Sequence, residues 1–253
     1  MARSVDPRLW RLLVCPACRN ALNRTLRCRG CGVVYPVVDG VPILTQIEAP
    51  LDCVDQYVLS HFPERAASKR LAQRLAVNKR IPDWITKSLR SHGVPEGPAI
   101  ELGCGPGGYG AVWSQSCEFT ILADIRRPFA MMAARHGAAI VCDAHNPPFR
   151  AASMSLVAAI NLLDDTPEPW LLLGQIDALL QPGGICVLAL PYAANFNGPA
   201  ELLATLRGSR SELPHLSYTV LASNEWLPWV VPAGERLVHE YQVHALIARK
   251  APL

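Results

Sequence analysis

The stretch Ala99-Ile-Glu-Leu-Gly-Cys-Gly-Pro-Gly-Gly108 decides the fold class of this 253-residue chain. Ala99–Leu102 is short and mostly apolar, which predicts a buried strand. The glycines that follow predict a sharp turn into a helix, because the backbone must approach a ligand closely at the helix N-terminus. We therefore expect this stretch to begin the first strand–loop–helix unit of a ligand-binding α/β fold.

Four more strands follow, with helical stretches between them. They are Thr120–Ala123, Ala138–Cys142, Leu156–Ile160 and Ile185–Leu190, the first three followed by Asp124, Asp143 and Asn161, with helices expected through Arg135 and over Trp170–Leu180. Past Tyr192 the sequence predicts a helix over Gly198–Gly208 and a closing antiparallel hairpin of Leu216–Leu221 and Arg236–Ala248. This alternation predicts a doubly wound, mostly parallel sheet of seven strands.

The glycine loop alone fits two kinds of cofactor. It spells GxGxxG, and Asp124 lies 21 residues after Gly103, as in dinucleotide-binding folds. Glu101 argues against a dinucleotide, because a carboxylate two residues before the first glycine repels a pyrophosphate. A further acid, Asp143, closes the third strand, where it can accept a hydrogen bond from an adenine amine. Both acids favour a cofactor without phosphate groups.

Four elements together resemble the class I S-adenosylmethionine-dependent methyltransferases, over residues 97–192. They are Glu101-Leu-Gly-Cys-Gly-Pro-Gly107, Asp124, Asp143 and Leu180-Gln-Pro-Gly-Gly184. The resemblance implies S-adenosylmethionine as the cofactor, whose ammonium and sulfonium charges favour a nearby carboxylate. Asp124 is then expected to accept from both ribose hydroxyls, and Asp143 from the adenine amine. The implied cofactor-binding residues are Glu101, Gly103, Gly105, Gly107, Asp124, Asp143, Ala144 and Asn161.

Two polar motifs lie near the expected acceptor side. Asn161-Leu-Leu-Asp164 resembles the histidine-type N-methyltransferases, which implies that Asn161 and Asp164 hold the acceptor and are the catalytic residues. The alternative is a capped turn in which Asp164 or Asp165 accepts from backbone amides. Asn146-Pro-Pro-Phe149 spells the NPPF signature of amino-methyltransferases, but it follows the third strand instead of the fourth. We therefore expect NPPF to be a loop on the cofactor side.

Two CxxC pairs, Cys15-Pro-Ala-Cys18 and Cys28-Arg-Gly-Cys31, predict one structural zinc ion. Four thiolates fill a tetrahedral site, so no position is left to activate water. With the strand pair predicted around Asp39-Gly40, the segment resembles the small zinc-ribbon proteins that bind and activate methyltransferases of the translation machinery. The resemblance implies a methyltransferase partner, here in the same chain. We expect Cys28→Ser to destabilise the ribbon and leave residues 99–190 able to fold.

The predicted domains are a zinc ribbon at 1–50, a helical connector at 51–98 and a methyltransferase domain at 99–253. Within the connector, Pro63-Glu64 predicts the start of a helix that ends before Pro82. Asp83 is expected to cap a second helix, which Gly93 ends.

Charge is divided unevenly along the chain. Residues 1–90 hold 15 Lys and Arg against 7 Asp and Glu, whereas residues 91–253 hold 9 against 14. A basic front half suits an anionic partner such as rRNA or tRNA, with Arg70, Arg74 and Arg80 as candidate contacts. The bland alternative is solvated surface, because 20 Arg against 4 Lys reflects genome composition bias equally well.

Three functions stay open from the sequence. The favoured one is methyl transfer to a nitrogen or oxygen of a small molecule or peptide side chain, with Trp226 and Trp229 either walling the acceptor pocket or packed in the core. The others are RNA methylation and a non-catalytic scaffold that binds S-adenosylmethionine. No apolar run reaches the roughly 18 residues that span a bilayer, and no signal peptide is recognisable. We therefore expect a cytoplasmic protein without a membrane partner.

Overall fold

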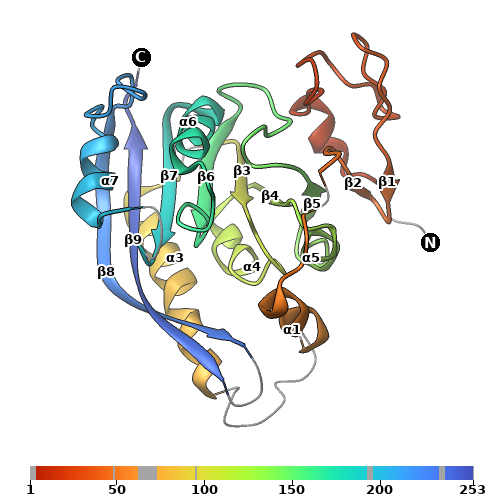
Figure 1. Cartoon of the computed structure of the whole chain (residues 1–253). Helices are drawn as coiled ribbons and strands as arrows, with labels where there is room; N and C mark the ends of the chain where they lie inside the picture. The colour runs from red at the N-terminus through yellow and green to blue at the C-terminus, as the bar shows by residue number, and fades with distance from the viewer. Residues whose placement is uncertain are drawn as a thin grey trace.

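A computed structural model describes residues 4–47, 49–61, 73–94, 96–192, 196–233 and 237–252. Its main element is a seven-stranded sheet with the strand order β5-β4-β3-β6-β7-β9-β8 (Figure 1). The strands are β3 (Pro98–Leu102), β4 (Phe119–Asp124), β5 (Ala138–Val141), β6 (Met154–Ile160), β7 (Leu180–Leu190), β8 (Tyr218–Pro232) and β9 (Val238–Lys250). Neighbours from β5 to β7 pair in parallel, and β9 runs antiparallel to both of its neighbours. This is the predicted doubly wound, mostly parallel sheet.

The order of the strands reverses between β3 and β6. From β3 the chain moves outward to β4 and β5, and then returns to β6 on the other side of β3. Ligands in such sheets bind in the crevice at the carboxyl ends of the strands beside this reversal. The predicted polar residues Asp124, Asp143 and Asn161 all lie at that edge, because each one ends or follows a parallel strand.

Helices cover both faces of the sheet. They are α1 (Cys53–His61), α3 (Arg80–His92), α4 (Gly110–Trp113), α5 (Arg127–Ala133), α6 (Pro169–Leu179) and α7 (Pro199–Thr205), with 3-10 turns η1 (Pro7–Arg11), η2 (Ala76–Lys79) and η3 (Ser114–Ser116). Residues of α3 and α4 form one hydrophobic cluster with β6, β7 and β9. Residues of α6 and α7 pack on the opposite face together with the N-terminal residues.

The N-terminal residues 4–47, called the ribbon below, lie beside β5 at the edge of the sheet (Figure 1). Their small sheet consists of β1 (Val37–Val38) and β2 (Val41–Pro42), paired antiparallel around the predicted turn. The turn residues Asp39 and Gly40 have φ of 47° and 81°, as a type I′ hairpin requires. The hairpin was therefore predicted correctly from the sequence.

The ribbon and the large sheet share one hydrophobic core. Leu13, Leu26 and Leu44 of the ribbon are at most 1% exposed and belong to the same cluster as Ile121 and Ile140 of the sheet. The crossover from β5 to β6, residues 142–153, contains no helix. The ribbon lies where a crossover helix usually covers the sheet. Since the core is shared, we no longer expect residues 99–190 to keep their stability when the ribbon unfolds.

The NPPF segment is the main docking point of the ribbon. The Val14 amide donates to the Pro148 carbonyl at 2.9 Å. The Arg19 guanidinium donates to the carbonyls of Pro147 and Phe149, at 2.8 and 2.6 Å. The Phe149 side chain is fully buried. The segment thus serves the contact with the ribbon, a role that our sequence-based interpretation as a cofactor-side loop did not include.

Two sequence-based boundaries were wrong. A helix was predicted to end before Pro82 and the next to begin at Asp83, but α3 begins at Arg80 and includes Pro82. Proline is tolerated there because the amides of the first helical turn have no partner within the helix. The helix predicted from Pro63 falls largely on residues outside the described part. The strand predicted to end at Leu221 continues through Pro228 to Pro232 as β8. β8 is the edge strand of the sheet, where a missing amide leaves no neighbour unpaired.

Replacing Arg19 tests the docking of the ribbon. Arg19→Ala removes two charge-assisted hydrogen bonds to buried loop carbonyls and is expected to lower the free energy of unfolding by about 2–3 kcal/mol. Urea denaturation measures this change. Arg27→Ala is the matched control, because Arg27 is an exposed arginine of the same ribbon. Equal stability of the two variants would contradict the role of Arg19.

Candidate functional site

The glycine loop after β3 folds back onto the end of β4. The Gly105 amide donates to Oδ2 of Asp124 at 2.8 Å. Gly103 has φ of +66°, and a Cβ there would meet the Leu162 side chain at 2.7 Å, so both backbone angle and space require glycine. A Cβ on Gly105 would meet nothing within 4 Å. The loop is therefore packed from below at Gly103 and open at Gly105, as a surface that receives a ligand must be.

Asp124 is buried at the carboxyl end of β4, with 4% of its surface exposed. Its Oδ1 accepts from the Arg126 amide at 2.8 Å. Burial raises the pKa of Asp124, against the lowering effect of the two backbone amides. The Arg126 side chain pairs with Asp55 of α1 at 2.8 Å, which ties this helix to the same edge of the sheet. Each carboxylate oxygen still has a lone pair for a ribose hydroxyl.

Glu101 is the most deeply buried acid of the site, at 1% exposure. Its Oε2 accepts from the Trp113 indole at 3.1 Å, and the same oxygen lies 2.5 Å from where a Cβ on Gly110 would be. Burial raises the pKa of Glu101 to about 8. The carboxyl therefore turns toward α4.

Asp143 follows β5 and binds its own loop. Its Oδ1 accepts from the backbone amide and from Nδ1 of His145, at 2.8 and 3.1 Å. The neighbouring residue, Ala144, packs against the large core as a partly buried side chain. The three acids Glu101, Asp124 and Asp143 thus lie at the ends of three adjacent strands, as the sequence predicted.

Asn161 occupies the end of β6 in a left-handed conformation, with φ of 54°. Its amide N–H donates to the Ala189 carbonyl of β7 at 2.6 Å. Both side-chain amide atoms are inaccessible to solvent, and neither has a hydrogen-bond partner among the described residues. Asp164, three residues later, is buried at 8% exposure. A buried, unpartnered amide is costly, and a bound molecule that pairs with it relieves that cost.

Sequence reasoning missed a polar chain at the end of β7. The Tyr192 hydroxyl hydrogen-bonds Nδ1 of His244, and Nε2 of His244 lies 2.7 Å from the Ser223 hydroxyl. His244 is 2% exposed and stands opposite Leu190 in the β7–β9 register. The sequence gives no signal for this role of His244, because single-sequence patterns do not show which strands become neighbours. Trp226 is 74% exposed, and Trp229 packs against Tyr241, with 5.2 Å between ring centroids.

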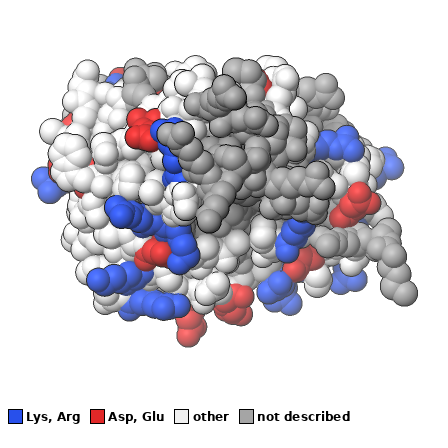
Figure 2. All heavy atoms as spheres, turned by 90° about the horizontal axis from the view of Figure 1, so that it is seen from below, with Lys and Arg blue, Asp and Glu red and all other residues white. Residues whose placement is uncertain are grey.

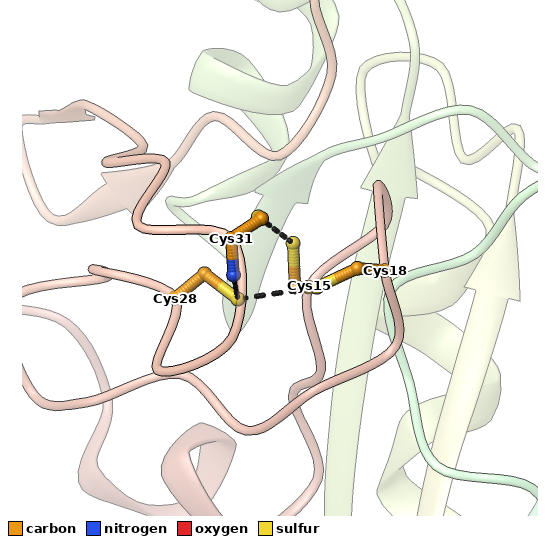
Figure 3. A group of neighbouring side chains, drawn as sticks. All are labelled: Cys15, Cys18, Cys28 and Cys31. Atoms are coloured by element: carbon orange, nitrogen blue, oxygen red, sulfur yellow. Dashed lines mark hydrogen bonds between the residues drawn. The ribbon is translucent and has the colours of Figure 1, made fainter.

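The four ribbon cysteines meet at one point, as Figure 3 shows. The sulfur atoms of Cys15, Cys18, Cys28 and Cys31 all lie within 4.8 Å of one another. Backbone amides of Gly30 and Cys31 donate to the Cys28 sulfur at 3.3 and 3.4 Å. Such N–H···S bonds stabilise thiolates, and four convergent sulfurs suit a tetrahedral zinc ion.

Comparisons with known proteins agree with this geometry. Residues 100–188 match the family described as "Methyltransferase domain", and residues 6–40 match "Trm112p-like protein". A UPF0434 protein of Maricaulis maris is 44% identical over 52 residues, which are 19% of this chain and 82% of that protein. The chain carries a class I methyltransferase domain with an N-terminal Trm112p-like zinc-ribbon region of the UPF0434 family.

Solved structures show the same fold at low sequence identity. Magnesium protoporphyrin IX methyltransferase from Synechocystis, solved with bound S-adenosylmethionine, is 13% identical with a TM-score of 0.53; the match covers 81% of this chain and all of that one. The N-methyltransferase NodS from Bradyrhizobium japonicum is also 13% identical, with a TM-score of 0.52 over 79% of this chain and 99% of its own. The cofactor of this methyltransferase is S-adenosylmethionine, and its partner is a methyl acceptor. Among the described residues, no helix is long and apolar enough to cross a membrane.

Metal analysis tests the cysteine site. We expect about one zinc ion per chain in protein purified without added metal, and Cys28→Ser should lose it and lower the stability of the whole fold through the shared core. Elemental analysis and thermal unfolding measure the two effects. Cys117→Ser, a cysteine outside the cluster, should keep the zinc. A zinc-free wild type would show that the ribbon folds without metal.

The raised pKa of Glu101 predicts a pH-dependent stability. The carboxyl has an ordinary pKa of 4.5 when unfolded and about 8 when folded, so the folded state holds a proton that the unfolded chain has lost. Its contribution to stability is therefore full below pH 4.5, is lost as the pH rises to 8, and stays lost above that. Glu101→Gln should flatten this part of the profile. Denaturant midpoints from pH 4 to pH 9 measure the difference between the two proteins, and parallel profiles would contradict the assignment.

Proposed function

We propose that this methyltransferase transfers the methyl group to a nitrogen or oxygen nucleophile of a small molecule or peptide side chain, with an imidazole as the best candidate. The observation that carries the proposal is the buried, unpartnered amide of Asn161. It lies at the end of β6, and the next residue, Leu162, packs over Gly103 of the glycine loop. The amide therefore neighbours the loop that is expected to hold the cofactor.

The polar groups at this edge match a planar nitrogen acceptor. The side chain of Asn161 offers one donor and one acceptor, and the buried carboxylate of Asp164 offers a second acceptor. A neutral imidazole has one N–H to donate, which these groups can orient, and one unprotonated nitrogen to attack the methyl group. Aromatic side chains lie nearby: Tyr192 and Phe196 have ring centroids 6.0 Å apart, and Trp170 and Phe196 4.8 Å.

The chemistry asks little of the protein beyond alignment. The unprotonated nitrogen attacks the methyl carbon, the carbon–sulfur bond breaks with its electrons returning to sulfur, and a carbon–nitrogen bond forms. The methylated ring then loses its remaining N–H proton, for which the carboxylate of Asp164 is our candidate acceptor. Orientation and exclusion of water supply most of the rate in such a displacement. The assigned cofactor-binding set is the one implied by the sequence, with Asn161 and Asp164 as the catalytic residues.

The structure offers less support for an RNA acceptor. Arg74 is paired with Glu240 at 2.6 Å, so its charge is already neutralised. Arg80 is exposed on α3, and Arg70 lies outside the described residues. On the visible part of the carboxyl-end face, Lys and Arg lie interspersed with Asp and Glu (Figure 2). RNA remains the second candidate because the ribbon resembles activators of translation-linked methyltransferases.

Methyl transfer to a panel of probes tests the acceptor class. With radiolabelled S-adenosylmethionine, we expect transfer to L-histidine, β-alanyl-L-histidine or a histidine-containing peptide, and none to free tyrosine or bulk tRNA. Activity on imidazole should change little between about 50 and 200 mM salt, a range over which phosphate-dominated binding weakens greatly. Salt-sensitive transfer to tRNA would replace this proposal with the RNA alternative.

Removal of Asp164 separates alignment from binding. Asp164→Ala should lower turnover about 100-fold while the affinity for S-adenosylhomocysteine stays within about twofold, because the lost contact orients only the acceptor. Glu168→Gln is the control, since Glu168 is an exposed acid of the same loop. Full turnover by Asp164→Ala would end the alignment role.

A further inference from the structure

A chain of hydrogen bonds connects the loop after β6 with the acid at the end of β5. Oγ1 of Thr166 lies 2.6 Å from Nε2 of His145, and Nδ1 of His145 lies 3.1 Å from Oδ1 of Asp143. An ionised carboxylate only accepts hydrogen bonds, so the ring proton that meets Asp143 is on Nδ1. In the neutral ring, Nε2 then accepts from the Thr166 hydroxyl. The chain thus has one direction, from threonine through histidine to carboxylate.

The hydrogen bonds to the Asp143 carboxylate end on one of its two oxygens. The backbone amide of His145 also donates to Oδ1, at 2.8 Å. Within the described part of the chain, every hydrogen bond to the side-chain carboxylate of Asp143 ends on Oδ1. These bonds set the rotation of the carboxylate, and Oδ2 is the oxygen left for a ligand.

The surroundings restrict the movement of both supporting residues. Thr166 is buried at 4% exposure, and the side chain of His145 is 24% exposed. The residue after His145 is anchored on the ribbon, because Nδ2 of Asn146 donates to the Pro16 carbonyl at 3.0 Å. His145 is therefore held from both sides.

We propose that His145 and Thr166 are positioning residues, which orient Asp143 so that the site selects a 6-amino purine over a 6-oxo purine. This inference rests on the proposed function, which assigns the cofactor's adenine to Asp143. An exocyclic amine donates to Oδ2, whereas a 6-oxo group presents a second acceptor and is repelled. A carboxylate that rotates freely can turn away from the 6-oxo group, so fixing its rotation sharpens the discrimination.

Binding of two product analogues measures this discrimination directly. S-adenosyl-L-homocysteine and S-inosyl-L-homocysteine share the ribose and the homocysteine and differ only at the purine 6-position. By calorimetry, the wild type should prefer the adenosyl compound by about 10- to 100-fold, the range for one charge-assisted hydrogen bond. His145→Phe and Thr166→Val should lower this ratio at least fivefold, and Thr166→Ser, which keeps the hydroxyl, should restore it.

The ratio separates positioning from general loosening of the fold. If the two residues only stabilise the fold, their replacement lowers the affinity for both analogues equally and leaves the ratio of the two affinities unchanged. That result would overturn the inference. His136→Phe is the matched control, since His136 is an exposed histidine in the turn after α5, and it should leave the ratio at the wild-type value. If His145→Phe does not fold, the pair Thr166→Val and Thr166→Ser decides, because the first change is close to isosteric and the second removes only a methyl group.

The failure of the inference is distinguishable from failure of the proposed function. A wild type that binds neither analogue contradicts the assigned cofactor site and, with it, this inference. A wild type that binds both analogues equally keeps the cofactor site but removes adenine from Asp143. If the wild type prefers the adenosyl analogue and both His145→Phe and Thr166→Val show the same preference, only the positioning role is overturned.

Discussion

Three successive backbone carbonyls, from Pro147 to Phe149, join the ribbon to the methyltransferase sheet. Each one accepts from the ribbon, either from the Val14 amide or from the Arg19 guanidinium. Pro147 and Pro148 can only accept in this contact, since proline has no N–H. The return bond of the antiparallel bridge between Leu13 and Phe149 comes from the Arg150 amide, which donates to the Leu12 carbonyl at 2.9 Å. An arginine, with several donors in one plane, can bind two carbonyls at once. The contact leaves the crossover without a helix and gives the ribbon a place in the main core.

The cofactor edge concentrates negative charge in a small space. Glu101 and Asp124 are both nearly inaccessible to solvent, and the charge of Asp124 adds to the effect of burial in raising the pKa of Glu101. Backbone amides of Gly105 and Arg126 offset part of that cost at Asp124, whereas Glu101 has the Trp113 indole. A cofactor that carries an ammonium and a sulfonium lowers the cost further, because opposite charges favour the ionised carboxyls. The same arrangement disfavours a pyrophosphate, so the electrostatics of this edge favour S-adenosylmethionine over a dinucleotide as the ligand of the glycine motif.

The sequence predicted those features that depend on local chain geometry. The strands before Asp124, Asp143 and Asn161 follow from short apolar runs bounded by turns, and the cysteine cluster follows from two tight CxxC turns. Features that join distant segments left no such signal: Arg19 binds carbonyls 128 and 130 residues away, and Tyr192 meets His244 across 52 residues. The closing hairpin was predicted, but the length of its first strand was underestimated for a different reason. Pro228 and Pro232 indicate a loop in isolation, and only the position of β8 at the sheet edge makes them compatible with a strand.

Because the ribbon and the methyltransferase domain are in one chain, the interface between them needs to supply less binding free energy than one between separate proteins. A UPF0434 protein is matched over most of its length by the ribbon region alone, so the module also exists without an attached methyltransferase. A separate ribbon must offset the translational and rotational entropy of association through its interface. A tethered ribbon docks intramolecularly, at an effective concentration in the millimolar range for short linkers. A few hydrogen bonds to one loop, together with a shared apolar core, are then enough to hold the ribbon. One of these bonds, from Asn146 to the Pro16 carbonyl, is made by the residue next to His145, whose ring binds Asp143. Docking of the ribbon thus offsets much of the entropy lost when the loop from Asp143 to Asn146 becomes ordered, so that less of this loss falls on cofactor binding.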